Sequence, residues 1–248
     1  STGKLLDKYL LPVDQGTRAL SSITVGKGGQ VFAADGMRNE IYTVEGKSLK
    51  LVVANPKLTS IRGLAVSDDG NTLYFADYAL GVFGADLNSG TGFPLAHDPT
   101  HLVLGGIEGL YWYQGCLVAI ENGMSPKRVV RLHLSKDGKS VVRMMPLDVA
   151  NPAFGLPTYG AVVGDDLYYI ANSQKGLYGQ YGDLKDKDKL QAVRIFRSNM
   201  HFAWAEGGIR AGMSLPVREA TPQEAAAARA KPSTPEPPKP AQPDKKGD

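Results

Sequence analysis

The chain has 248 residues, with 28 Lys and Arg against 25 Asp and Glu, and a single cysteine. Its 42% hydrophobic and 21% charged residues are ordinary for a globular protein, which excludes wholesale disorder and a coiled coil. No apolar run approaches the ~20 residues of a membrane helix, and a formal net charge of +3 is too small to argue nucleic-acid binding. One cysteine excludes an internal disulfide framework and a cysteine-based zinc cluster.

The first predicted element is a strand over residues 5–10, which has no partner before it and resembles the outermost strand of a sheet unit. Either it completes the last unit of a closed ring of four, or the chain lacks earlier units. We favour the second interpretation, because the chain starts in the middle of a unit and without Met. No signal peptide precedes this strand, so the chain is either processed or a fragment, and its compartment stays open.

Four segments then repeat one pattern: an apolar strand, a tight turn with Gly or Asp-Gly, a second strand, and a final Asp or Asn. They are SSITVGKGGQVFAAD (residues 21–35), RGLAVSDDGNTLYFAD (62–77), EGLYWYQGCLVAIEN (108–122) and YGAVVGDDLYYIAN (159–172). Their first residues are 41, 46 and 51 positions apart. A period of about 40–50 residues is the size of one four-stranded propeller blade, so the sequence predicts an all-β propeller.

Each repeat is followed by residues that fit the third and fourth strands of a blade. These are residues 40–44 and 49–53, then 81–87 and 93–96, then 128–134 and 140–144, and finally 192–196 after a long polar loop. Asp35, Asp77, Asn122 and Asn172 follow the second strands. Because they recur in every blade, we expect them to fix local backbone turns and not to contact a ligand.

The composition changes near Ser214, after which there are eight prolines and no aromatic residue. We therefore expect residues 1–213 to form the propeller domain and residues 214–248 to form a disordered tail rich in Pro, Ala and Lys. Residues 221–230 of this tail carry Pro at a start position and good helix formers after it, which predicts a short helix.

The repeats IRGLAVSDDGNTLYFADY, GIEGLYWYQGCLVAIENG and PTYGAVVGDDLYYIANSQ resemble the SMP-30/gluconolactonase/LRE-like β-propellers, and more widely the NHL-repeat and strictosidine-synthase-like group. The resemblance covers about residues 1–197. It implies a six-bladed propeller, of which this chain would supply about four blades. It also implies either a metal-dependent lactone or ester hydrolase or a binding module, because both occur in the wider group.

In the gluconolactonase-like enzymes a divalent metal is held by an acid of the first blade, an Asn and an Asp, while a second Asn helps to bind the substrate. The first-blade acid has no counterpart in this chain. The metal-binding Asn corresponds to Arg62, the Asp to Glu108, and the substrate-binding Asn to Ser21. Ca²⁺ prefers six to eight oxygen ligands, and only Glu108 keeps a suitable oxygen. We therefore expect no metal cofactor, with Ca²⁺ or another divalent cation at Glu108 as the alternative.

Ser21, Arg62, Glu108 and Tyr159 start the first strand of successive blades, and that strand lines the central channel of a propeller. These four side chains are therefore expected to ring one mouth of the channel. One interpretation is a binding site in which Arg62 holds a charge, Glu108 serves as a general base, and Ser21 and Tyr159 donate hydrogen bonds. The other is a hydrated rim with a compensating pair of Arg62 and Glu108.

Three further features are expected to be structural. Alternation places Tyr111 and Tyr113 on one face and Trp112 on the other, which suits packing between blades, and Cys116 is expected to be a small buried residue. A basic group around Arg128 and Arg131 needs no nucleic-acid partner. Lys175 lies in a charge-mixed loop that is expected to be exposed.

The function that the sequence favours is a propeller that binds a small molecule or a protein partner at the channel mouth. The alternative is a metal-dependent lactone or ester hydrolase of the gluconolactonase-like type, with Glu108 as the candidate catalytic and metal-binding residue. A nucleic-acid partner is not expected.

Overall fold

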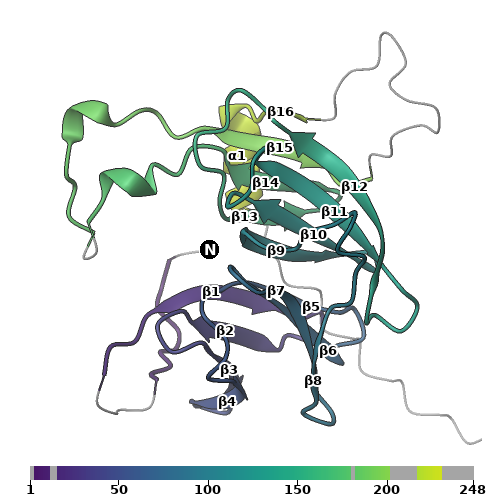
Figure 1. Ribbon diagram of the computed structural model, residues 1–248. Coiled ribbons are helices and arrows are strands. Elements are labelled where there is room, and N and C mark those ends of the chain that lie inside the picture. Colours follow the sequence, from purple (N-terminus) through teal and green to yellow (C-terminus); the bar gives the residue numbers. More distant parts are fainter. Residues whose placement is uncertain (1–2, 12–15, 180–181, 202–216, 231–248) are drawn as a thin grey trace, which may run out of the picture.

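Four antiparallel sheets of four strands each follow one another along the chain and form the blades of a β-propeller (Figure 1). The computed structural model describes residues 3–11, 16–179, 182–201 and 217–230. In each blade the strands are joined in sequence order, as in a meander, and the first strand lies innermost. The repeat period therefore predicted the fold class correctly.

The first two blades take up the N-terminal part of the described chain. Blade 1 consists of β1 (Leu20–Val25), β2 (Val31–Asp35), β3 (Glu40–Glu45) and β4 (Ser48–Ala54). Blade 2 consists of β5 (Ile61–Val66), β6 (Thr72–Asp77), β7 (Gly81–Asp86) and β8 (Gly92–Pro94).

The other two blades carry the longer strands and the helices. Blade 3 consists of β9 (Ile107–Tyr113), β10 (Cys116–Glu121), β11 (Arg128–Leu134) and β12 (Val141–Val149). Blade 4 consists of β13 (Gly160–Val163), β14 (Asp166–Ile170), β15 (Ile195–Asn199) and β16 (Val217–Glu219). Two 3-10 helices, η1 (Lys175–Leu177) and η2 (Lys187–Lys189), lie in the loop between β14 and β15, and α1 (Pro222–Ala230) follows β16.

The strand predicted over residues 5–10 is wrong. This segment is described, pairs with no other strand, and exposes Leu5, Leu6 and Leu10 to solvent. A strand needs a neighbour that completes its backbone hydrogen bonds, and the described part of the chain offers this segment none.

The predicted boundary between propeller and tail also needs correction. β16, within the expected tail, pairs with β15 and supplies the fourth strand of blade 4, and the Glu219 carboxylate lies 3.1 Å from the Arg194 guanidinium. The short helix is confirmed as α1, which a capping box starts: the Thr221 backbone N–H donates to Glu224 at 2.9 Å, and the Glu224 N–H donates to the Thr221 hydroxyl. Residues 231–248 of the expected tail lie outside the described residues.

Among the residues that the structure describes, three apolar cores hold the blades together, one between each pair of successive blades. Blades 1 and 2 share a core around Phe32, Ile41, Leu64 and Phe75, and blades 2 and 3 share one around Tyr74, Leu110, Leu117 and Leu132. Blades 3 and 4 share a core around Ile120, Val129, Leu167 and Tyr169.

The expected alternation along β9 is confirmed by these cores. Trp112 packs against the core of blades 2 and 3, where its ring stacks on Tyr74 at 5.7 Å, while Tyr111 and Tyr113 belong to the core of blades 3 and 4. Cys116 is buried, as expected. Within the described residues no helix is both long and apolar enough to span a membrane.

Candidate functional site

The polar residues that follow the second strands fasten the backbone, as predicted. The fully buried Asp77 accepts hydrogen bonds from the backbone N–H groups of Thr59 and Ser60, at 2.6 and 2.9 Å, and from those of Ala79 and Leu80, each at 3.0 Å. These bonds tie the entry of blade 2 to the turn after β6. They leave the carboxylate no free face for a ligand.

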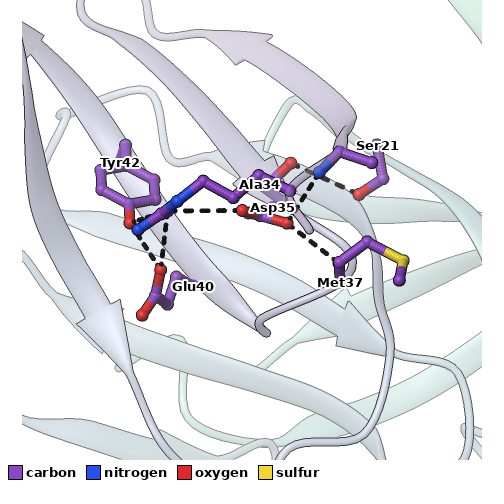
Figure 2. A network of polar contacts seen from close by, with 8 residues as sticks. Ser21, Ala34, Asp35, Met37, Glu40 and Tyr42 are labelled. Carbon is purple, nitrogen blue, oxygen red and sulfur yellow. Dashed lines mark hydrogen bonds and ion pairs between the residues drawn. The ribbon is translucent and has the colours of Figure 1, made fainter. Parts of the chain in front are cut away.

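Asp35 plays the same part in blade 1 (Figure 2). Its carboxylate accepts from the N–H of Ala19 at 3.2 Å and of Met37 at 3.0 Å, and an Arg18 nitrogen lies 3.5 Å away. The same Arg18 nitrogen donates to the Tyr42 hydroxyl at 2.7 Å. This network spreads over the blade 1 face opposite blade 2.

Asn122 and Asn172 also bond backbone, although the strand register places them one residue later than the two aspartates. Asp77 pairs with Ile61, and the residue of blade 3 in that register is Glu121. Asn122 donates to the Pro157 carbonyl at 2.7 Å, and Asn172 donates to the Ala192 carbonyl at 3.0 Å. The two aspartates thus fix the turns that follow them, as predicted, whereas the two asparagines bond backbone 35 and 20 residues further along the chain.

Ser21 lies in β1 at the channel, and its hydroxyl faces backbone carbonyls. The oxygens of Ile61 and Ala34 lie 3.2 and 3.4 Å from it (Figure 2 labels Ser21 and Ala34). Because a hydroxyl has one proton to donate, this proton joins β1 to β2 or to β5. The role of Ser21 as a donor to a ligand stays a prediction.

Glu108 lies in β9, is 4% exposed, and forms an ion pair with the Lys175 ammonium. Lys175 begins η1, so it reaches the channel mouth from the loop between β14 and β15. Its nitrogen also lies 4.8 Å from the centroid of the Tyr159 ring, within the range of a cation–π contact. Lys175 is exposed, as expected, but its ion pair with Glu108 was not foreseen from the sequence.

Arg62 lies in β5, next to β9. Its Nε donates to the Ser60 hydroxyl at 2.9 Å, and its guanidinium lies 5.7 Å from the centroid of the Tyr78 ring. An ion pair of Arg62 with Glu108 was one expectation for this mouth, but the partner of Glu108 is Lys175. Sequence periodicity gave no signal for this, because Lys175 belongs to no strand.

The charges of Glu108 and Arg62 act on the pKa values of two tyrosine hydroxyls, those of Tyr159 and Tyr78. Burial and the Glu108 carboxylate raise the pKa of Tyr159 to about 12, while Arg62 opposes the shift. Burial and Glu108 also raise the pKa of Tyr78, again against Arg62. Both hydroxyls are therefore neutral hydrogen-bond donors at pH 7, and the Tyr78 hydroxyl already donates to Asn122 at 2.9 Å. The structure thus brings Arg62, Glu108 and Tyr159 together with two residues that the sequence did not single out, Lys175 and Tyr78.

A cavity of about 430 Å³ lies in the channel beside these residues. It is lined by the inner strands of all four blades, and its wall includes Ser21, Leu64, Leu110 and Tyr159. Its size falls within the usual range for small-molecule pockets. The wall combines apolar side chains with a few polar groups.

Cationic groups lie around Glu108 at this mouth. Its carboxylate pairs with the Lys175 ammonium, and Arg62 on the neighbouring strand β5 carries a guanidinium, which offers no lone pair to a cation. Among the residues that the structure describes, no three His, Cys, Asp or Glu side chains gather in a way that would hold a metal ion.

Two arginines of the predicted basic group serve the packing of blade 3. Arg131 is 8% exposed and donates to the Met200 carbonyl and, at 3.2 Å, to His133. Arg128 forms an ion pair with the buried Glu121. Neither guanidinium belongs to an open basic surface.

No protein-family model matches the chain, and no curated protein matches it in sequence. Among solved structures, a chain of a nidogen/laminin complex superimposes with a TM-score of 0.54 and 16% identity over 74% of this chain and 61% of that chain. A luciferin-regenerating enzyme superimposes with a TM-score of 0.51 and 20% identity over 73% of this chain and 61% of that chain.

The present chain therefore covers about three fifths of each of these two structures. Identities this low show the fold and no activity. One of these two structures is of an enzyme and the other is of a protein complex, and what they have in common with this chain is the β-propeller fold.

Proposed function

We propose that this propeller is a binding module that holds a small molecule through a carboxylate or similar anionic group at the channel mouth. The observation that carries the proposal is the convergence of Arg62, Lys175 and Tyr159 around Glu108 beside the channel cavity. Two cations against one carboxylate leave one excess positive charge at the mouth.

The chemistry of these groups suits an anionic ligand. A guanidinium forms strong, charge-assisted and often bidentate hydrogen bonds with carboxylates. A neutral Tyr159 hydroxyl adds a donor, and its high pKa keeps the proton in place. Leu20 and Ile23 of β1 line the same cavity with exposed side chains and offer apolar contacts to the rest of the ligand.

We further infer that the chain is related to the SMP-30/gluconolactonase/LRE-like propellers, with NHL-type proteins as more distant relatives. The repeated segments support this relationship, and the similarity to the luciferin-regenerating enzyme supports its fold. The replacement of the expected metal ligands favours binding over a metal-dependent hydrolase.

The first test is the affinity for a panel of small carboxylates, from acetate to aromatic acids, measured by calorimetry. We expect Arg62→Ala to weaken the best binder about tenfold or more, since a hydrogen bond to a charged group contributes about 1.5–3 kcal/mol. Arg143→Ala is the matched control, because Arg143 is exposed on β12. Equal affinities in wild type and Arg62→Ala would refute this assignment of the site.

A second measurement addresses the hydrolase alternative. The metal-stripped protein is unfolded thermally with and without Ca²⁺, Mn²⁺ or Zn²⁺. A cation that binds the native state adds about 2.7 kcal/mol at a hundredfold excess over Kd. We expect no rise of the midpoint; a rise that disappears in Glu108→Ala would overturn the binding-module proposal in favour of a metal centre.

A further inference from the structure

The Lys175 ammonium occupies a site at the channel mouth that has the features of a receptor for a primary amine. On one side is the Glu108 carboxylate, which is almost inaccessible to solvent, and on the other is the face of the Tyr159 ring at 4.8 Å. A carboxylate and an aromatic face together are the groups that recognise an ammonium ion. In this structure the ammonium comes from the protein's own chain.

The Lys175 side chain is able to leave while its backbone stays in place. The base of its loop is fastened by two hydrogen bonds between Gln174 and Gln191, at 2.9 and 2.7 Å, and by the bond from the Arg194 N–H to Asn172 at 2.7 Å. Figure 1 shows this loop, with its two helical turns, reaching out from blade 4. The Lys175 side chain itself is 42% exposed, so rotation into solvent is sufficient to vacate the site.

Departure of Lys175 would leave a buried carboxylate without a counter-ion, which is strongly unfavourable. A neutral or purely anionic ligand gives no compensation, whereas a ligand with its own ammonium group does. The arrangement therefore selects for a positive charge at Glu108, while Arg62 selects for a negative charge. Arg62 of β5 and Glu108 of β9 lie on neighbouring inner strands, next to Gly63 and Gly109, where the two strands approach closely, so the two subsites adjoin.

We infer that the channel mouth binds zwitterionic small molecules of the amino-acid class, whose ammonium displaces Lys175 from Glu108 while their carboxylate is held by Arg62. Lys175 then acts as a tethered surrogate that neutralises the Glu108 carboxylate while no ligand ammonium is bound, and Arg62 stays available to a carboxylate. This inference rests on the proposed function, because it uses the same anion subsite.

The test compares ω-amino acids from glycine to 5-aminopentanoate with the alkanoates of equal length, from acetate to pentanoate, by calorimetry on the full chain. The readout is the ratio of the alkanoate Kd to the amino-acid Kd. In Lys175→Met the site is vacant, and we expect this ratio to rise about tenfold or more above wild type for at least one chain length. Adding Glu108→Gln should abolish the gain.

Lys185→Met is the control, since Lys185 is exposed in the same loop, and it should leave the ratio unchanged. A ratio that stays at its wild-type value in Lys175→Met, while alkanoates still bind and still depend on Arg62, overturns this inference and leaves the proposed function standing. If no alkanoate and no amino acid binds any variant, both are overturned.

Discussion

The carboxylate of Asp77 joins the backbone before β5 to the turn after β6 within blade 2. Burial by itself would raise the pKa of its carboxyl, but hydrogen bonds from the backbone of Ser60 and Thr59 outweigh burial and lower it. A carboxyl whose pKa is depressed by folding stabilises the native state above its unfolded pKa of about 3.9. That contribution is lost as the pH falls through the lower folded-state value.

We therefore expect Asp77→Ala to lower the free energy of unfolding by about 3 kcal/mol or more at pH 7, because several buried N–H groups lose their acceptor. The variant should also lose part of the decline in stability that wild type shows below pH ~4. Chemical denaturation from pH 7 to pH 3 measures both effects. Asp188→Ala, in an exposed loop, serves as the control; an Asp77→Ala variant as stable as this control would contradict the anchoring role.

The contact of Lys175 with Glu108 could not be predicted from the sequence repeats. Arg62 and Glu108 were found because each occupies the same position in a repeat, and repeats align without any knowledge of the fold. Tyr159 was aligned with them, although the strand register places it one residue later. Lys175 comes from a loop that has no counterpart in the other repeats, so only folding brings its ammonium to Glu108.

The inner strands, at the scale of the element, approach one another so closely that a side chain is excluded at some positions. A Cβ on Gly63 of β5 would lie 2.6 Å from the Leu110 nitrogen of β9. The neighbouring atom is backbone and has no room to give way, so the strand would have to shift. Gly92 of β8 is the contrasting case, because the nearest atom to a Cβ there is the Gly84 carbonyl oxygen at 3.9 Å.

Gly63→Ala is therefore expected to destabilise the protein by about 1–3 kcal/mol through overpacking between blades 2 and 3. Gly92→Ala should be neutral or slightly stabilising, because it restricts the unfolded chain without a clash. Urea denaturation of the two variants gives the comparison. Similar stabilities would mean that the inner strands are not held at this spacing.

The sequence was sufficient to predict that α1 is a helix, but not to predict where this helix packs. Its capping box is legible in the sequence as Thr221 followed by Glu224. Its Glu224 forms an ion pair with Arg197 of β15, at 3.1 Å. Arg197 pairs with Tyr168 on the face of blade 4 that points away from blade 3, so α1 lies against that face.

At the scale of the whole molecule, the described blades pack through three similar interfaces, and one face of blade 1 lies outside them. Equivalent positions in two blades can therefore contribute differently to the free energy of unfolding. Leu64 of β5 is 3% exposed in the core of blades 1 and 2. The matching residue in blade 1 is Ile23, which is 69% exposed on a face that no described blade covers. The same apolar position is thus buried between blades at Leu64 and exposed to solvent at Ile23.

Truncation at these two positions should differ accordingly. We expect Leu64→Ala to cost about 2–5 kcal/mol of unfolding free energy, and Ile23→Ala to change it by no more than about 0.5 kcal/mol. Equilibrium denaturation of the 248-residue chain measures both. A large loss for Ile23→Ala would show that this face is covered in solution.

The sequence by itself determined the class of fold, the four blades and most strands, because the alternation of side chains and the turn residues are local and repeat at a fixed period. It also predicted α1, through the Pro near its start and the helix formers that follow, and three of the residues at the channel mouth. It failed for residues 5–10 and for β16, because pairing of a strand depends on a partner far along the chain. The tertiary structure alone decided that Glu108 pairs with Lys175 and not with Arg62, since a contact across 67 residues follows from how the blades and the loop pack and not from any local pattern.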